Sequence, residues 1–350
     1  MGKLKKLTGY RLFLPLSCLI IVLLINLITT PTFFRITINN GVLYGYIIDV
    51  INRASELVVL AVGMTLVVSA SAGTDISVGA VMAVAAAVCT RVLAGGEVSV
   101  NEYANPYVLA VLAALAAAVV CGGFNGLLVA KLKIQPMVAT LILFTAGRGI
   151  SQLVTNGQIT YIRVDGYKLL GNNIPGIPIP TPIFVAVIVV ALTYILLKKT
   201  AMGMYIQSVG INERASRLVG LKSVKIIWMA YAFCGLCAGI AGLVASSRIY
   251  SADANNIGLN MELDAIAAVA LGGNSLGGGR FSLLGSVIGA YTIQALTTTL
   301  YAMSVPADQI PVYKAIVVIL IVAVQSEELK KFRKRLASRH ASRNVKGGAA

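Results

Sequence analysis

Apolar stretches about as long as a membrane-crossing helix recur along almost the whole chain. A helix of about 20 apolar residues crosses a hydrocarbon core of roughly 30 Å. We find ten such stretches: residues 12–30, 54–72, 77–94, 106–130, 136–155, 181–197, 226–247, 261–273, 281–301 and 312–325. The sequence therefore predicts an all-α, polytopic membrane protein with about ten transmembrane helices.

The composition supports this class. Of the 350 residues, 57% are hydrophobic and 12% are charged, whereas roughly 25% of the residues in an ordinary soluble domain are charged. So few charges would not cover the surface of a soluble protein. We therefore expect no soluble catalytic domain.

Two of the predicted spans are irregular. The spans at 77–94 and 261–273 are bounded or interrupted by Gly, Ser and Asp rather than by a long polar loop. A membrane tolerates a broken or re-entrant helix only where protein or a cavity surrounds it. We expect both spans to be of this kind, and the sequence leaves open whether the turn at 73–79 re-enters the membrane.

The net charge of +16 comes from basic residues placed between the spans and at the chain ends. With a cytoplasmic N-terminus, most of the 29 basic residues fall on the cytoplasmic side, as the positive-inside rule requires. This predicts two cytoplasmic termini, a transmembrane domain over 1–330 and a basic cytoplasmic tail over 331–350. The charge thus indicates topology and contact with membrane lipid, not binding of nucleic acid.

Counting residue types argues against enzymatic chemistry. All five cysteines fall within predicted spans, and the single histidine, His340, lies in the tail. A disulfide framework, histidine-based catalysis and histidine metal clusters are therefore not expected. The function classes that remain are transport and membrane scaffolding.

The basic loop at about 198–225 contains a candidate docking helix. Residues 212–218 form two amphipathic turns, and Gly210 and Gly220 bracket them. Such a helix suits docking into a groove of a partner, although it could also lie on the lipid surface. The candidate coupling residues are Gly210, Asn212, Glu213, Ala215, Ser216 and Gly220.

A second motif, LGGNSLGGGRFS at 271–282, has part of the spacing of a phosphate-binding loop. It lacks the lysine that reaches the phosphates. We therefore interpret it as a tight, glycine-packed break between two helices. The candidate structural glycines here and in the first break are Gly73, Gly79, Gly272, Gly273, Gly278, Gly279 and Gly285.

Several polar residues lie inside apolar spans, where they are costly unless they face the bundle interior. Thr74, Asp75 or Ser77 can cap the helix that begins near Val78, but Asp75 can also contact a sugar hydroxyl. The others can serve as interhelix hydrogen-bonding groups or as a solute pathway. The pathway candidates are Thr74, Asp75, Ser77, Asn125, Arg148, Gln152 and Gln294.

Three motifs carry a resemblance to a known family. AGTDISVGAVMAVAAA at 72–87, SVGINERASRLVG at 208–220 and the glycine-rich stretch at 262–290 resemble motifs of the permease subunit of bacterial ATP-binding-cassette sugar importers, ribose-type branch. Residues 43–55, 134–149 and 313–326 are most similar to permeases for galactofuranose uptake. The chain departs from the family pattern at Thr74, where isoleucine is usual, and at Ser216, where alanine is usual.

The resemblance implies a non-catalytic subunit in the bacterial cytoplasmic (inner) membrane. A separate cytoplasmic ATPase would bind ATP and Mg, so that this chain carries no cofactor. A periplasmic binding protein would deliver a neutral sugar, with galactofuranose favoured over ribose or another monosaccharide. A second permease subunit, identical or paralogous, would complete the pathway. A secondary transporter or channel and a structural membrane scaffold are the alternatives.

Overall fold

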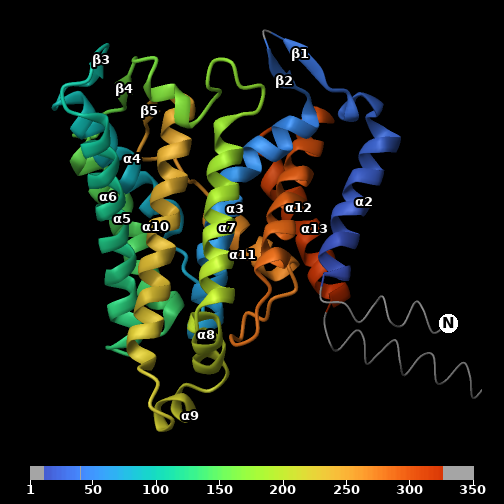
Figure 1. The fold of residues 1–350 in the computed structure, drawn as a ribbon. Helices are drawn as coiled ribbons and strands as arrows, with labels where there is room; N and C mark the ends of the chain where they lie inside the picture. Colours follow the sequence, from blue (N-terminus) through green and yellow to red (C-terminus); the bar gives the residue numbers. More distant parts are fainter. Residues whose placement is uncertain (1–11, 40, 326–350) are drawn as a thin grey trace, which may run out of the picture.

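A computed structural model of the chain describes residues 12–39 and 41–325. A helix lies at each of the ten predicted places (Figure 1). These helices are α2 (Phe13–Thr29), α3 (Tyr46–Ser71), α4 (Val78–Ala94), α5 (Tyr107–Ala130), α6 (Pro136–Val154), α7 (Thr181–Lys199), α10 (Ser223–Ile249), α11 (Met261–Leu271), α12 (Leu283–Ala302) and α13 (Ile310–Gln325).

Six of the described helices are long and apolar enough to cross a membrane: α3, α5, α6, α7, α10 and α12. The chain is therefore a multi-pass membrane protein, as predicted. Helix α11 has 11 residues, which at 1.5 Å per residue is about 17 Å and too short to cross alone. A count of ten crossings thus stays a prediction.

Helices α3 and α10 form the centre of the bundle. In the apolar 18-residue stretch of each helix, 89% of α3 and 72% of α10 is buried, against 28% of α5 and 22% of α7. Helix α10 packs on α5, α3 and α4. The outer helices therefore present apolar side chains to lipid, and the two central helices present theirs to protein.

Glycines allow the central helices to cross closely. A Cβ atom added to Gly235 of α10 would lie 2.4 Å from the carbonyl oxygen of Ala118 and 2.9 Å from the Cα of Gly122, both on α5. Small residues matter here because water does not drive apolar helices together inside lipid, so that close van der Waals packing must hold them. The crossing of α5 and α10 depends on this pair of glycines.

We expect the Gly235→Val variant to lose thermal stability. The added side chain would force α5 and α10 apart, and overpacking of this kind costs about 1–3 kcal/mol. Thermal unfolding of the purified chain in detergent would measure the loss. The matched control is Gly149→Val on α6, where a Cβ atom meets nothing within 4 Å. Equal melting temperatures for the two variants would contradict this close-packing role.

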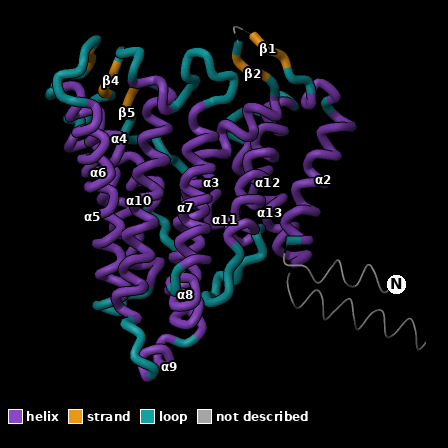
Figure 2. The backbone as a smooth tube through the Cα atoms, in the orientation of Figure 1, coloured by secondary structure: helices purple, strands orange, loops and turns teal. Residues whose placement is uncertain are grey.

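Strands and helical appendages occupy opposite ends of the bundle (Figure 2). One end carries the hairpin of β1 (Thr37–Asn39) and β2 (Val42–Tyr44) and the small sheet of β3 (Ser99–Val100), β4 (Thr160–Ile162) and β5 (Ser251–Ala252). Single 3₁₀ turns, η1 (Pro31–Phe34) and η2 (Tyr167–Leu170), lie in the connections. The transmembrane part is helical as expected, and the strands are short additions to its loops.

The other end carries α8 (Met202–Ile211) and α9 (Glu213–Leu218). Helix α2 begins and α13 ends at this same end (Figure 1), an arrangement consistent with both termini on one side of the membrane. That this side is cytoplasmic stays a prediction. Residues 1–11, which include the first basic cluster, and the predicted tail at 331–350 lie outside the described residues.

We expected residues 198–225 to form a loop with a single short helix. The structure has α9 there, as expected, and a second helix, α8, before it. Gly203, Ile206 and Val209 recur every three residues and are buried. Helix α8 packs through this face against α3, α7 and α10. Only that packing makes this segment a helix, because its length and hydropathy alone are equally compatible with a loop.

Candidate functional site

The first break, residues 72–77, folds back into the bundle. Ala72 ends α3 with a left-handed backbone, at φ 52°. The N–H of Asp75 then lies 3.5 Å from the Sδ of Met64, two helical turns before the end of α3. Seven residues of helix are about 10 Å, so the break is re-entrant and α4 begins inside the bundle.

The second break, residues 250–260, connects α10 to α11 and contacts the first break inside the bundle. A Cβ atom on Gly79 would lie 2.2 Å from the carbonyl oxygen of Gly258 and 2.3 Å from Oε2 of Glu262. The N-terminal ends of α4 and α11 therefore touch inside the protein. We call residues 72–79 and 253–262, together with Asn125 of α5, which contacts Ser77, the break junction.

Three of the predicted pathway residues form one buried cluster in the junction. Oδ1 of Asp75 accepts hydrogen bonds from the backbone N–H of Ser77 at 2.9 Å and from its hydroxyl at 2.6 Å. Nδ2 of Asn125, on α5, donates to the hydroxyl of Ser77 at 2.8 Å and lies 3.4 Å from the carboxylate. Asp75 therefore binds Ser77, the residue that precedes α4. Within the described part of the chain, no side chain caps the first turn of α4, so the interpretation that Thr74, Asp75 or Ser77 caps this helix is wrong.

Arg148 and Gln152, on α6, hold the second break in place. Nη1 of Arg148 donates to the carbonyl oxygens of Ala254 at 2.9 Å and Ile257 at 2.5 Å. Nε2 of Gln152 donates to Oδ1 of Asn255 at 2.7 Å. Arg148 thus satisfies two backbone carbonyl oxygens that a continuous helix would pair, which is what irregular backbone inside a membrane needs, and Gln152 fixes the side chain of Asn255 beside them.

Gln294 lies apart from the junction. Among the residues that the structure describes, its Nε2 donates only to the hydroxyl of Thr298, 3.4 Å away on the same helix. The structure thus brings Asp75, Ser77 and Asn125 together, places Thr74 beside them, and leaves Gln294 outside.

Three polar atoms of the junction are buried without a hydrogen-bond partner among the described residues. They are Oγ1 of Thr74, Oδ1 of Asn125 and Oε2 of Glu262. An unpaired buried polar atom costs about 1–3 kcal/mol, so that each of these atoms favours contact with water or a polar solute. The sequence analysis did not include Glu262, although an acid at the start of an apolar span was a usable signal.

The glycine-rich loop is a tight structural break. Asn274, which the sequence analysis also missed, donates from Nδ2 to the carbonyl oxygen of Val269 at 3.0 Å and to the hydroxyl of Ser286 at 2.7 Å. Its Oδ1 accepts from the N–H of Ser282 at 2.6 Å. One asparagine side chain therefore joins the two sides of the loop.

Most of the candidate structural glycines make close backbone approaches. At Gly73, Gly79, Gly272, Gly278, Gly279 and Gly285 an added Cβ atom would lie within 3 Å of a neighbouring atom. Gly273 has φ 76°, a left-handed conformation that other residues adopt rarely. Gly272 and Gly285 face each other, so that α11 and α12 meet where the loop begins and ends.

The coupling segment contacts α3, beside the first break, and the glycine-rich loop. A Cβ atom on Gly210 would lie 1.7 Å from the carbonyl oxygen of Ser69 and 2.6 Å from the backbone nitrogen of Gly279. Helix α8 therefore ends directly against α3, next to the first break, and against the glycine-rich loop. Movement of α8 would be transmitted to both.

Helix α9 has the predicted boundaries to within one residue. Asn212 is its N-cap, and Oδ1 of Asn212 accepts from the N–H of Ala215 at 2.9 Å. Ser216 is buried, and Gly220 follows the helix with φ 86°. The N-cap residue and the glycine that follows the helix account for where it starts and stops.

Glu213 anchors α9 to the rest of this end. Its Oε1 accepts from Nζ of Lys133 at 2.6 Å, from the guanidinium of Arg217 and from the hydroxyl of Ser223 at 3.1 Å. Burial acts to raise the pKa of Glu213, but these hydrogen bonds outweigh it and lower the pKa below its ordinary value of 4.5. A lowered pKa stabilises the fold above that value, and the contribution is lost only as the pH falls through the lowered pKa.

A comparison with protein families decides the family of this chain. Residues 46–325 match the model described as "Branched-chain amino acid transport system / permease component". The chain belongs to this permease family. As a permease it is a transport component and not an enzyme, and the resemblance to sugar-import permeases is confirmed by its relatives.

Relatives of the permease align over nearly its full length. The galactofuranose transporter permease protein YtfT of Escherichia coli (strain K12) is 44% identical over 93% of this chain and 92% of that protein. The fructose import permease protein FruF of Bifidobacterium longum (strain NCC 2705) is 37% identical over 96% and 94%. The ribose import permease protein RbsC of E. coli (strain K12) is 35% identical over 89% and 93%. No solved structure matches the permease.

We expect the Glu213→Gln variant of the permease to release α9. Loss of the carboxylate charge weakens the contacts with Lys133 and Arg217, which are partly exposed, and such pairs contribute up to about 1 kcal/mol. Limited trypsin digestion after Arg217 should therefore speed up by at most about fivefold, and less at high salt because exposed charges are screened. Arg214→Gln is the control, since Arg214 makes no ion pair within the described part of the chain. Equal digestion rates for wild type and Glu213→Gln would count against the anchoring role.

Proposed function

We propose that this permease is the membrane subunit of an ATP-driven, binding-protein-dependent importer of a neutral sugar, located in the bacterial cytoplasmic (inner) membrane. Permeases named for the import of galactofuranose, fructose and ribose are similar to it over most of their length. Its partners would be a cytoplasmic ATPase, a periplasmic sugar-binding protein and a second permease subunit, identical or paralogous.

The observation that carries this proposal is the exposed apolar surface of the coupling segment. Ile211, Leu218 and Val219 are 65%, 89% and 78% exposed, at the end of the bundle where α9 projects (Figure 1). Apolar side chains on a short helix outside the membrane suit a groove in a partner. The same segment rests through Gly210 on α3 and the glycine-rich loop, so that a docked ATPase would act on the first break and on the glycine-rich loop.

We assign ATP and Mg to that partner and no cofactor to this chain. With Gly273 and Gly278 as the two glycines of the pattern, the glycine-rich loop has Gly279 where a phosphate-binding loop has lysine. Its Gly279 N–H already donates to the carbonyl oxygen of Ser69 at 3.0 Å. The purified permease should therefore not retain labelled ATP.

Galactofuranose is the sugar we favour. Thr74 and Asn125 of the break junction have unpaired, uncharged oxygens, which suit the hydroxyl groups of a neutral solute. The choice among sugars rests on the relative named for galactofuranose, which is 44% identical, against 37% and 35% for those named for fructose and ribose.

The deciding experiment is uptake of labelled galactofuranose into proteoliposomes that contain the permease, the ATPase and the binding protein. We expect uptake that requires ATP and that excess ribose and fructose inhibit weakly. Selective binding of an amino acid or a nucleoside by the binding protein would overturn the sugar assignment.

The alternative is an ion-coupled secondary transporter. Two buried carboxylates at the junction, Asp75 and Glu262, are the feature that favours it, because intramembrane acids commonly couple transport to protons. Uptake by the permease alone, driven by a proton gradient and abolished by a protonophore, would support this alternative and reject the ATP-driven importer.

A further inference from the structure

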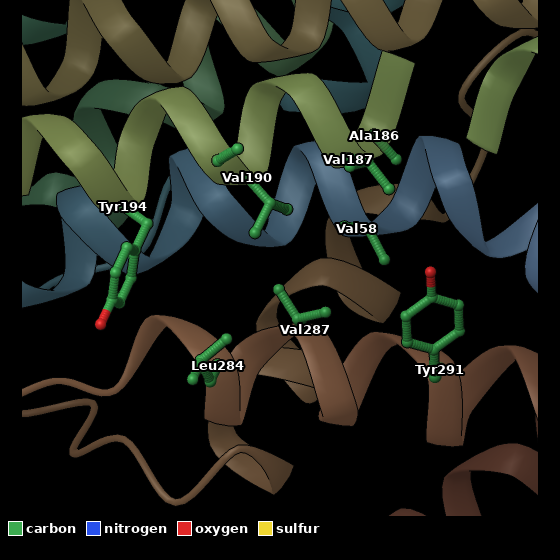
Figure 3. Close-up of a pocket in the computed structure, with 9 residues that line it drawn as sticks. Val58, Ala186, Val187, Val190, Tyr194, Leu284, Val287 and Tyr291 are labelled. Atoms are coloured by element: carbon green, nitrogen blue, oxygen red, sulfur yellow. The ribbon is translucent and has the colours of Figure 1, made fainter. Parts of the chain in front are cut away.

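An apolar groove separates α7 from α12. Helix α7 packs mainly on α3, which leaves a hollow of about 300 Å³ beside α12. In Figure 3, Val187 and Val190 of α7 face Val287 and Leu284 of α12 across open space, and Val58 of α3 lies between them. The remaining lining residues are Ala186, Ala191, Tyr194 and Tyr291. Apart from two tyrosine hydroxyls, this lining has no polar side chain, unlike a path for a sugar.

The groove becomes basic toward the end that carries α8. A second hollow of about 410 Å³ shares Tyr194 and Leu284 with the first. Lys198 and Gln207 are among its lining residues. Lys198 is exposed, and it makes no ion pair with any residue that the structure describes. The groove therefore has a positive charge at one end that the protein leaves uncompensated.

The first turn of α8 adds to the positive character of this end. Gly203 and Met204 line the second hollow and lie in the first turn of a ten-residue helix. The backbone N–H groups of a first helical turn have no partner within the helix and attract anions. The N–H of Met202 already donates to the hydroxyl of Thr200, so that the helix N-terminus only adds to the field, and the free ammonium group of Lys198 is the feature that favours an anion at this end of the groove.

We propose that one anionic phospholipid occupies this groove, with an acyl chain between α7 and α12 and its phosphate at Lys198 and the start of α8. The apolar part of the groove lies between the membrane helices α7 and α12. Its basic end lies at Lys198, in the last turn of α7. An amphiphile with an apolar chain and a negative headgroup matches a groove that is apolar along its length and basic at one end. An apolar helix of a second permease copy in the same place would bury Lys198 without a counter-charge, which is costly.

Native mass spectrometry of the full chain in detergent tests the proposal. The probes are phosphatidylglycerol, which is anionic, and phosphatidylethanolamine, which is zwitterionic. We expect wild type to retain one phosphatidylglycerol in preference to phosphatidylethanolamine. Lys198→Ala should weaken retention of phosphatidylglycerol about fivefold, the effect of one basic residue beside an anionic headgroup, and should remove the preference. Lys199→Ala is the control, because Lys199 does not line the groove.

A second pair of variants tests the acyl-chain part. Ala191→Phe fills the groove from an exposed lining position, so the substitution does not disturb the core, and it should abolish retention of phosphatidylglycerol. Leu192→Phe, exposed on the same helix but outside the groove, should retain the lipid as wild type does. Equal effects within either pair of variants would overturn the proposal.

Cross-linking tests the competing occupant. In native membranes, a Val187→Cys variant should stay monomeric under mild oxidation if lipid fills the groove. Rapid formation of a disulfide-linked dimer through Cys introduced at this position, above the background of the wild type, would show that a second copy occupies the groove and would overturn the lipid assignment.

Discussion

Gly210→Ala is expected to abolish uptake by the assembled importer while the chain remains in the membrane. The new methyl group would have to occupy a position 1.7 Å from the carbonyl oxygen of Ser69, which is backbone and cannot rotate away. Helix α8 must therefore move off α3 and off the glycine-rich loop, at a cost of about 1–3 kcal/mol. Uptake into vesicles should fall by about 5- to 150-fold, toward the background, since 1.4 kcal/mol corresponds to a factor of ten.

The control for Gly210→Ala is Gly149→Ala, where the added carbon meets nothing within 4 Å and uptake should stay normal. If Gly210→Ala lowers the amount of chain in the membrane, Ala215→Glu tests docking separately. Ala215 is exposed on α9, so its replacement leaves the packing of α8 intact but places a charge on the docking surface. Normal uptake in both Gly210→Ala and Ala215→Glu would reject the coupling role of this segment.

Asp75→Ala is expected to produce the largest loss of stability among substitutions in the break junction. It removes the acceptor of two hydrogen bonds from Ser77, so that a buried N–H and a buried hydroxyl lose their partner. Each such loss costs about 1–3 kcal/mol. The melting temperature in detergent should drop strongly, and uptake should disappear.

Asp75→Asn separates the two interpretations of Asp75. The amide oxygen can still accept both hydrogen bonds from Ser77, so we expect this variant to recover stability and uptake together. A variant that is stable but inactive would instead indicate that the carboxylate itself contacts the solute or carries a proton. Gln294→Leu serves as a comparison, because the only hydrogen bond of Gln294 within the described residues is the long one to Thr298, and its effect should be small.

The glycine-rich loop shows what a sequence motif can predict when its tertiary contacts are unknown. Its missing lysine favoured a tight break, and the structure shows Gly272 and Gly285 closely packed against each other there. The residue that organises the break, Asn274, was not predicted, because its partners Val269 and Ser286 lie on two different helices. A lone asparagine among glycines is equally compatible with a flexible turn.

The sequence by itself determined where the ten long apolar segments form helices and that α9 ends before Gly220. These features are local, because apolar length and one glycine decide them. Gly210 was expected to mark the start of α9, but it lies inside α8, and the N-cap Asn212 marks that start instead. Only the tertiary structure decided that α8 is a helix, that Arg148 holds the second break, and which helices are central. The physical reason is that lipid and protein interior are both apolar. Helices α3 and α7 have mean hydropathies of 1.8 and 2.2, yet they are 89% and 22% buried, so that neither hydropathy nor periodicity distinguishes a side chain facing lipid from one facing another helix.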